Sequence, residues 1–339
     1  MSPVADFGFY QRRKHDKWRE VQPPVPPLEF SVADSHAHVH MLPDPAWELA
    51  RCGANGVGFL CMIVDPAEDG PRPFDLFQGW IDKAESLLQA DAREAAGAHG
   101  LAADRSEALA CPEVRIAVGV HPHNAKLYDA AIEAEVVRRL NDSRVGCLGE
   151  IGLDYHYDLS PREVQRQVFS RQIQLAKDAR LPIALHLRGG EDSQRDDAHA
   201  EALAILRDVG FPPCGTLLHC CALPPDRLQP WLEEGCFVAY GGAITFKAAD
   251  AAREGARIVP EDRLMLETDA PYMTPEPMRG SACTPAHVVF TAQRLAEVRG
   301  KHPGSERLDF LRRLYETTTG FYTRLDKRDK RDKRGVETS

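Results

Sequence analysis

The sequence has little of what disulfide-bonded, membrane-spanning or secreted proteins require. Its nine cysteines form no C-x-x-C pair and their total is odd, which argues against a disulfide framework or a structural zinc ribbon. No stretch approaches the roughly 20 consecutive apolar residues of a membrane span. Residues 1–20 are polar and basic and contain no apolar core of a signal peptide. We therefore expect reduced thiols, no membrane association and a cytoplasmic protein.

The chain also lacks a basic surplus. Its 339 residues include 42 Lys and Arg against 51 Asp and Glu, and the formal net charge is −9. Proteins that bind duplex nucleic acid without sequence preference usually carry a basic stripe. If nucleic acid is the substrate, local Arg and Lys side chains or metal charge must attract it, because the overall field does not. No feature of the sequence indicates an obligate protein partner.

What the sequence does contain is a regular alternation of strand-like and helix-like segments. Most of the strand-like runs are apolar throughout, which is typical of parallel strands buried on both faces. Eight such units predict an α/β fold of the (β/α)8 TIM-barrel type, and an open doubly wound sheet is the alternative. The expected strands are 30–39, 57–64, 115–120, 145–152, 182–187, 215–220, 236–242 and 264–269.

Composition divides the chain into three parts. Residues 1–29, which include Pro23-Pro-Val-Pro-Pro27, are expected to form an irregular N-terminal arm. Residues 30–324 form the predicted barrel domain. Residues 325–339 contain a three-fold Asp-Lys-Arg repeat without apolar residues, which predicts a solvated, disordered tail.

The barrel domain carries a long insertion at about 65–113, between the second and third predicted strands. It begins with a loop rich in Asp, Gly and Pro, after which Phe74, Phe77 and Trp80 lead into a helix. These three rings either anchor the loop to the rim of the barrel or form a wall on which bases stack. The sequence leaves both interpretations open.

Polar side chains follow the predicted strands where they end. His36 and His38 are two residues apart in the first strand, so their imidazoles point to the same face and can bind one metal ion. Only a closed ring brings the ends of strands 1, 4, 5, 6 and 8 together, at the face where barrel enzymes have their active sites. This placement favours the barrel over the open sheet. The later strands end with Glu150, His186, His219 and Asp269.

Four imidazoles and two carboxylates predict a metal centre. This donor set suits zinc, manganese, nickel or iron(II), and we expect two divalent metal ions, with zinc, manganese and magnesium left open. Six ligands suit two metals that share a bridging carboxylate, for which Glu150 is the candidate. Two divalent ions, two carboxylates and a hydroxide leave a charge of about +1, which attracts a phosphate ester. Asp269 is expected to orient the nucleophile and accept its proton.

The candidate ligands lie in six motifs: Asp34-Ser-His-Ala-His38, Gly119-Val-His-Pro-His123, Gly149-Glu-Ile-Gly-Leu-Asp154, His186-Leu-Arg188, Leu218-His-Cys220 and Glu267-Thr-Asp-Ala-Pro-Tyr272. Together, from about residue 30 to 300, they resemble the TatD family of metal-dependent hydrolases within the amidohydrolase superfamily. The resemblance implies a TIM barrel and metal-dependent DNase activity. It also implies one metal on His36, His38, Glu150 and Asp269, and a second on Glu150, His186 and His219.

Other residues of these motifs are candidates for secondary roles. His121 could contact a phosphate or hydrogen-bond within a turn, and His123 is expected to be structural. Arg188 could reach a phosphate oxygen in charge-assisted bonds or form a salt bridge. Tyr272 is a candidate substrate contact, and Glu267 is expected to orient a ligand.

The chain departs from the family pattern in its substrate-side loops. The stretch Gly280-Ser-Ala-Cys-Thr-Pro-Ala-His287 stands where the family commonly has Arg-Asn-Glu-Pro, and Phe321 replaces a usual Asn. The leading hypothesis is a two-metal phosphodiesterase, a deoxyribonuclease that acts on strand ends or single strands. The alternatives are a two-metal hydrolase of an amide, lactone or phosphomonoester, and a catalytically silent binding protein.

Overall fold

Eight parallel strands form the centre of the molecule, in the order β10-β9-β8-β7-β6-β5-β4-β3. The computed structural model describes residues 11–14, 17–21, 28–99, 110–190 and 197–323. Each of the eight predicted runs overlaps an observed strand, so the predicted strand order along the chain is confirmed. The strands are β3 (Val32–Ala37), β4 (Val57–Val64), β5 (Glu113–Val118), β6 (Val145–Asp154), β7 (Ile183–Arg188), β8 (Thr216–Leu218), β9 (Phe237–Tyr240) and β10 (Leu264–Leu266).

The two outer strands of this sheet meet and close the barrel. Just beyond β10, Asp269 donates its backbone N–H to the carbonyl of His36 at 2.9 Å, and His38 donates to the carbonyl of Ala270 at 2.7 Å. The buried Asp34 supports the junction, because its carboxylate accepts both the hydroxyl and the backbone N–H of Thr268, at 2.6 and 3.0 Å. The predicted barrel is confirmed and the open sheet is wrong.

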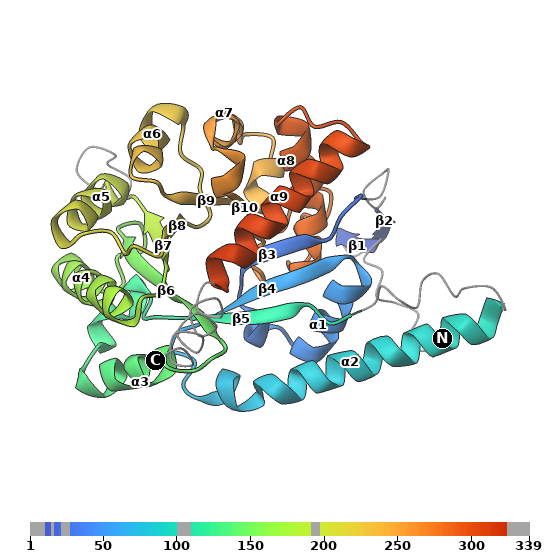
Figure 1. The fold of residues 1–339 in the computed structure, drawn as a ribbon, viewed down its shortest axis with the longest axis horizontal. Coiled ribbons are helices and arrows are strands. Elements are labelled where there is room, and N and C mark those ends of the chain that lie inside the picture. The colour runs from blue at the N-terminus through green and yellow to red at the C-terminus, as the bar shows by residue number, and fades with distance from the viewer. Residues whose placement is uncertain (1–10, 15–16, 22–27, 100–109, 191–196, 324–339) are drawn as a thin grey trace, which may run out of the picture.

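Helices surround the strands (Figure 1). They connect each strand to the next, as expected for parallel strands, which need a crossover connection. In the described part of the chain the helices are α1 (Pro45–Ala54), α2 (Arg72–His99), α3 (Ala130–Leu140), α4 (Arg162–Ala179), α5 (Ala198–Val209), α6 (Pro225–Glu233), α7 (Asp250–Ile258), α8 (Val288–Val298) and α9 (Ser305–Tyr322). None of them is both long and apolar enough to cross a membrane.

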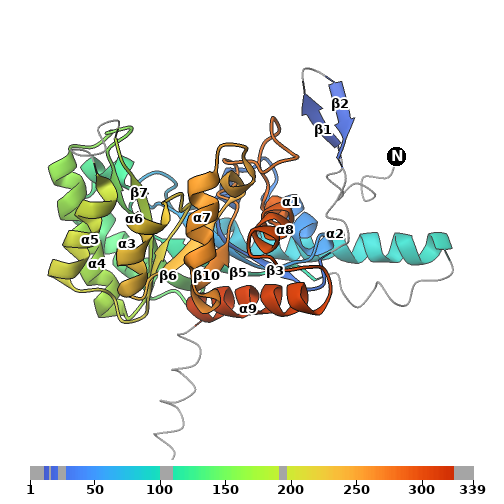
Figure 2. The ribbon, with the colours of Figure 1, turned by 90° about the horizontal axis from the view of Figure 1, so that it is seen from above.

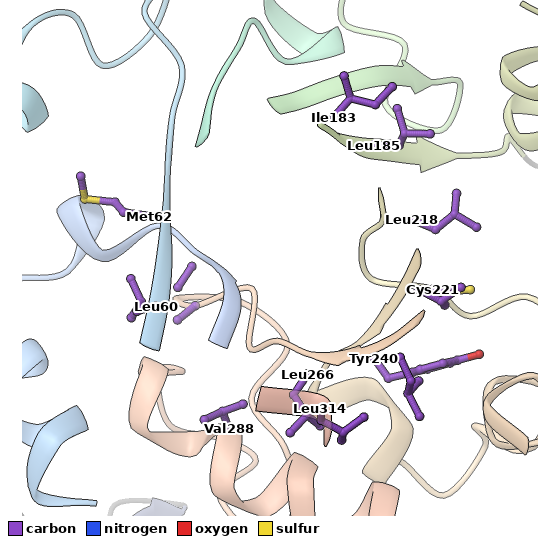
Figure 3. Close-up of a cluster of buried hydrophobic side chains, with 14 of the residues drawn as sticks. Leu60, Met62, Ile183, Leu185, Leu218, Cys221, Tyr240, Leu266, Val288 and Leu314 are labelled. Atoms are coloured by element: carbon purple, nitrogen blue, oxygen red, sulfur yellow. The ribbon is translucent and has the colours of Figure 1, made fainter. Parts of the chain in front are cut away.

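The hydrophobic core fills two layers. Small and medium side chains such as Ala117, Cys147 and Ala184 fill the interior of the barrel, and a larger layer lies between the strands and the helices. Figure 3 shows part of this outer layer, where Leu266 of β10 lies near Leu314 of α9.

Helix α9 covers the end of the barrel at which the strands begin. The carbonyl oxygen of Tyr322 would lie only 2.3 Å from a Cβ added at Gly146, next to the first residue of β6. Figure 2 shows α9 lying along one side of the strands. The end of the barrel where the strands finish is therefore the end available to a substrate.

The insertion and the N-terminal segment give the remaining elements. Helix α2 is 28 residues long; it packs against α1 and then extends away from the barrel (Figure 1). Strands β1 (Gln11–Lys14) and β2 (Lys17–Glu20) pair antiparallel, so these residues are not irregular as expected. The predicted arm also covers residues 1–10, 15–16 and 22–27, which lie outside the described residues, as does the tail from 325. The domain boundaries stay predictions.

Candidate metal centre

The six predicted ligands meet where the strands finish, and Glu150 lies at their centre. Its Oε1 is 2.7 Å from Nδ1 of His186 and 2.9 Å from Nε2 of His219. Its Oε2 faces the other way, 3.4 Å from Nε2 of His36 and 3.8 Å from Nε2 of His38. Each oxygen of this buried carboxylate therefore faces a different pair of imidazoles.

Asp269 completes one of two ligand groups. Its Oδ1 lies 3.6 Å from Nε2 of His38 and 3.8 Å from Nε2 of His36. The possible ligand atoms of these three residues all lie within 4.8 Å of one another, and the same holds for Glu150, His186 and His219. The two groups follow the division that the family resemblance implies, with Glu150 between them.

The electrostatics of Asp269 keep its carboxyl group ionised. Burial raises the pKa of this group, but the neighbouring His38 and the other nearby imidazoles outweigh burial and hold the pKa below its ordinary value. Its backbone has a φ of 59°, a left-handed conformation that few non-glycine residues adopt. The hydrogen bond from the backbone N–H of Asp269 to the carbonyl of His36 helps to hold this backbone conformation.

The chemistry of His36 fits a bound metal. Its side chain is fully buried, and among the described residues neither ring nitrogen has a hydrogen-bond partner. Burial, and then the charge on His219, lower the pKa of His36 and favour the neutral ring that ligates metals. An unpartnered buried polar atom is costly, and a metal at Nε2 would supply the missing partner. The nitrogen and carboxylate donors present therefore fit divalent metal ions.

Two further carboxylates lie near the far nitrogens of candidate ligand histidines. Glu267, fully buried, places Oε2 3.4 Å from Nδ1 of His219, and its Oε1 accepts the backbone N–H of Cys220 at 2.6 Å. Asp154 Oδ2 lies 3.0 Å from Nε2 of His186. Carboxylate–histidine pairs of this kind fix the ring so that its other nitrogen faces the metal. The orienting role expected for Glu267 agrees with this geometry, whereas sequence reasoning assigned no role to Asp154.

Asp154 is held in its charged form. Burial raises the pKa of this carboxyl group, but hydrogen bonds from His123, His186 and the backbone N–H of Tyr157 outweigh burial and hold the pKa well below its ordinary value. Its Oδ1 accepts backbone N–H groups of His156 and Tyr157 at 2.9 and 2.8 Å. A charged carboxylate only accepts hydrogen bonds. Nε2 of His186 can therefore donate its proton to Asp154, and a metal at Nδ1 would replace the proton that Nδ1 shares with Glu150.

The predicted substrate contacts lie around this centre. His121 accepts the N–H of His123 at its Nδ1, and its Nε2 lies 3.8 Å from Glu150 Oε1. Tyr272 is 51 % exposed, and its ring centroid lies 6.2 Å from that of His38. These two side chains border the candidate metal centre. His123 makes hydrogen bonds within the protein, as expected, since its Nε2 lies 2.9 Å from Asp154.

Arg188 is exposed and stacks on an aromatic ring that sequence reasoning missed. Its guanidinium carbon lies 4.7 Å from the ring centroid of Tyr157, which is itself 54 % exposed. Within the described residues Arg188 forms no ion pair. The signal for Tyr157 was its position, three residues after Asp154 at the end of β6.

Two of the three aromatic residues of the insertion are packed into the core. Phe74 is 3 % exposed and Phe77 is 7 % exposed, and both belong to the main hydrophobic cluster. Guanidinium groups cover them: Arg139 lies 4.0 Å from the ring centroid of Phe74, and Arg144 lies 5.3 Å from that of Phe77. For Phe74 and Phe77 the wall interpretation is wrong and the anchor interpretation holds. Trp80 is only half-buried.

The loop before α2 is tied to the rim of the site. Asp65 Oδ2 accepts the backbone N–H of His121 at 3.1 Å and the side-chain amide of Asn124 at 2.8 Å. At the other side, Asp69 Oδ1 lies 2.9 Å from Nε2 of His40. The loop therefore spans from the segment after β3 to the segment after β5, and it borders the opening of the barrel.

A barrel that carries this donor set where its strands finish defines a metal-dependent hydrolase. The model of the TatD related DNase family matches residues 33–307, and the chain belongs to that family.

Relatives agree with this assignment. The chain is similar to the uncharacterized metal-dependent hydrolase YabD of Bacillus subtilis, with 34 % identity over 183 residues, 54 % of this chain and 69 % of that protein. It is also similar to the 3'-5' ssDNA/RNA exonuclease TatD of Escherichia coli K12, with 29 % identity over 188 residues, 54 % of this chain and 69 % of that protein.

Solved structures support the fold. The TatD homolog YJJV from Escherichia coli K12 superposes with a TM-score of 0.66 at 21 % identity, over 86 % of this chain and 97 % of its own. A TatD family hydrolase from Entamoeba histolytica gives the same TM-score at 16 % identity, over 87 % and 99 % of the two chains.

Proposed function

We propose that this chain is a two-metal phosphodiesterase that hydrolyses DNA at strand ends or in single strands. The position of Glu150 carries this proposal, since its two oxygens face two separate ligand groups. A carboxylate in that position suits a bridge between two divalent ions. The Escherichia coli relative is named as an exonuclease of single-stranded DNA and RNA, and this supports the choice of substrate.

The chain's own residues would bind the phosphodiester and move the proton. When bound, the divalent metals would supply positive charge that activates water and stabilises the phosphoryl group. Asp269 orients the attacking water and accepts its proton at the carboxylate. His121 presents Nε2 to a phosphoryl oxygen, because its Nδ1 is engaged by the N–H of His123. Arg188 binds another phosphoryl oxygen, and Tyr272 contacts the substrate at the side of His38.

The metals proposed are two per chain, with zinc, manganese and magnesium as candidates. Nitrogen-rich donor sets favour zinc or manganese over magnesium, and elemental analysis of the purified protein distinguishes them. The setting proposed is the cytoplasm. All nine cysteines lie among the described residues and are free thiols, which suits a reducing compartment.

Hydrolysis of bis(p-nitrophenyl) phosphate tests the proposal. Activity should disappear with a chelator and return with added divalent metal. A panel that adds a p-nitrophenyl phosphomonoester, a lactone and an amide separates this proposal from the other metal-dependent hydrolyses. If the enzyme hydrolyses the monoester, the lactone or the amide but not the diester, the phosphodiesterase proposal is overturned. If the metal-loaded protein hydrolyses none of the four compounds, it is a binding protein.

The variant Asp269→Asn tests the proton acceptor. A carboxamide can still offer an oxygen to a metal, but it cannot accept a proton from water. Turnover should therefore fall far more than metal content. Equal losses of metal and turnover would reduce Asp269 to a plain ligand.

A further inference from the structure

A groove lies beside the metal centre, between the segment that follows β3 and the first turns of α2. Its volume is about 540 Å³, within the range of roughly 300–1,000 Å³ that small-molecule sites occupy. The first half of α2 packs along α1 at this place, as Figure 1 shows. The lining combines apolar side chains with charged ones, among them Met41, Arg72, Trp80 and Lys83.

The apolar part of the groove suits a flat ring. Met41 ends the short 3-10 helix η1 (Val39–Met41) and is 46 % exposed. Trp80 lies on α2 and is half-buried, with part of the indole packed against the core and part lining the groove. An indole is the strongest aromatic partner for a stacked ring, and a thioether adapts its shape to one. Nucleobases stack on such surfaces with little dependence on sequence.

The carboxylates that line the groove are already engaged. Asp44 Oδ1 accepts the N–H of Trp47 at the start of α1, and its Oδ2 accepts from Lys83 Nζ at 2.8 Å. Asp69 Oδ2 accepts the backbone N–H of Asp65 at 2.8 Å, and its Oδ1 faces His40. Neither carboxylate therefore presents a free negative charge to a ligand.

One of the two cations that line the groove is available to a ligand. Arg72 is exposed, and in the part of the chain that the structure describes it makes no hydrogen bond and no ion pair. The pair between Lys83 and Asp44 is 55 % and 47 % exposed at its two side chains. Lys83 keeps Asp44 neutralised, so Arg72 is the cation that the groove offers to an incoming anion. The groove thus offers an apolar surface next to positive charge that a phosphate would pair.

The groove and the candidate metal centre are separated by the side chain of His40. His40 lines the groove, and the ring centroid of His40 lies 6.2 Å from that of the candidate ligand His38. Asp69, which also lines it, belongs to the loop that Asp65 ties to His121 on the other side of the opening. The groove therefore borders the rim of the candidate metal centre.

We propose that this groove binds the nucleotide adjacent to the hydrolysed phosphodiester of a single-stranded substrate. The base lies against Trp80 and Met41, and its phosphate binds Arg72. This inference rests on the proposed phosphodiesterase function and deepens it, because it makes a nucleic-acid strand, and not any small diester, the preferred substrate. Stacking predicts selectivity for a strand over a duplex, with weak dependence on base sequence.

Charge reversal at Arg72 tests the groove without removing packed atoms. Binding of a short fluorescein-labelled oligothymidylate with phosphorothioate linkages, which resist cleavage, is measured by anisotropy on the metal-loaded full chain. Arg72→Glu should raise Kd about tenfold or more, because a charge-assisted phosphate contact is lost and repulsion is added. The matched control is Arg312→Glu, which makes the same charge change on α9, on an arginine that is 47 % exposed. Equal weakening by both variants overturns the proposal, since only the overall field would then matter.

Two substitutions at Trp80 test the stacked base. Trp80→Ala should raise Kd, whereas Trp80→Phe, which keeps an aromatic face, should recover most of the affinity. Melting temperatures of both variants identify any loss caused by unfolding. Identical Kd values for the alanine and phenylalanine variants, in folded protein, overturn the role of the ring.

The small diester separates failure of the groove from failure of the proposed function. If bis(p-nitrophenyl) phosphate is not hydrolysed, the phosphodiesterase proposal fails, while the binding assay still reports on the groove. If the small diester is hydrolysed but the oligothymidylate does not bind wild-type protein, the groove proposal alone fails. If Arg72→Glu impairs hydrolysis of the small diester as strongly as it impairs binding of the oligonucleotide, the groove proposal is also overturned.

Discussion

Oδ2 of Asp154 lies 3.0 Å from Nε2 of His186, on the side of the imidazole away from Glu150. Because Asp154 stays ionised, it can accept the proton of Nε2, while Nδ1 faces Glu150 Oε1 at 2.7 Å. One carboxylate at the end of β6 therefore favours Nδ1 as the nitrogen of this candidate ligand on β7 that a metal would bind.

We predict that Asp154→Asn weakens metal binding at the group formed by Glu150, His186 and His219. Asparagine can donate as well as accept, so the tautomer and angle of His186 are no longer fixed. Loss of such a partner typically costs about 10–100-fold in metal affinity. Titration of the metal-free protein with a competing chromophoric chelator measures this affinity directly, without reference to activity.

His123 provides the control for this prediction, because it contacts the same Oδ2 of Asp154 at 2.9 Å. His123→Gln leaves the contact between Asp154 and His186 in place, so metal affinity should change much less. If the His123 variant loses as much affinity as the Asp154 variant, the effect does not act through His186.

Removal of the central carboxylate should affect both metals. In Glu150→Ala the two ligand groups lose the side chain that lies between them, so occupancy at each should fall. Inductively coupled plasma analysis of the purified variant measures metal per chain. His38→Ala is the comparison, since His38 belongs to only one group and should cost about one metal. A Glu150 variant that keeps one metal at full occupancy rules out the bridge.

The stacked guanidinium of Arg188 should matter for substrate affinity. Arg188→Ala is expected to raise KM for a phosphodiester, at a cost of roughly 1.5–3 kcal/mol if a charge-assisted bond is lost. Steady-state kinetics with bis(p-nitrophenyl) phosphate separate KM from kcat. Arg188→Lys keeps the charge but not the planar fork, and should recover only part of the loss. Wild-type KM and kcat in the alanine variant would assign Arg188 to structure alone.

Sequence reasoning predicted the barrel and the central ligands because both follow from local rules. Continuous apolar runs identify buried parallel strands, and polar residues at the ends of those runs must gather at one face of a closed ring. His36 and Asp269 illustrate the second rule, since they are far apart in sequence and their side chains lie 3.8 Å apart in the structure.

The parts that were missed depend on contacts between loops. The bond from Asp65 to Asn124 joins residues 59 positions apart, and no periodicity marks it. The ring of Tyr157 could be located in sequence, but its stacking with Arg188 depends on how two strand ends face each other. The sequence gives no basis for distinguishing Phe77 from Trp80. The packing of α2 makes the Phe77 ring buried and leaves the Trp80 ring half-exposed.

Phe77 should therefore behave as a core residue. We predict that Phe77→Ala lowers the free energy of unfolding by about 3–5 kcal/mol, the range for removing a buried aromatic side chain. Part of that cost comes from Arg144, whose guanidinium faces the ring at 5.3 Å and also holds Asp142 and the carbonyl of Phe74. Thermal and urea unfolding followed by circular dichroism measure the change.

Trp80→Ala is the matched comparison, because both residues lie on α2 and differ in burial. Below the melting temperature, Phe77→Ala should reduce hydrolysis of an oligonucleotide and of a small diester in the same proportion, through the folded fraction alone. Trp80→Ala should instead lower oligonucleotide binding with a smaller loss of stability. A Phe77 variant with unchanged melting temperature and selectively weakened oligonucleotide binding would mean that this ring faces the substrate, which its burial against the core contradicts.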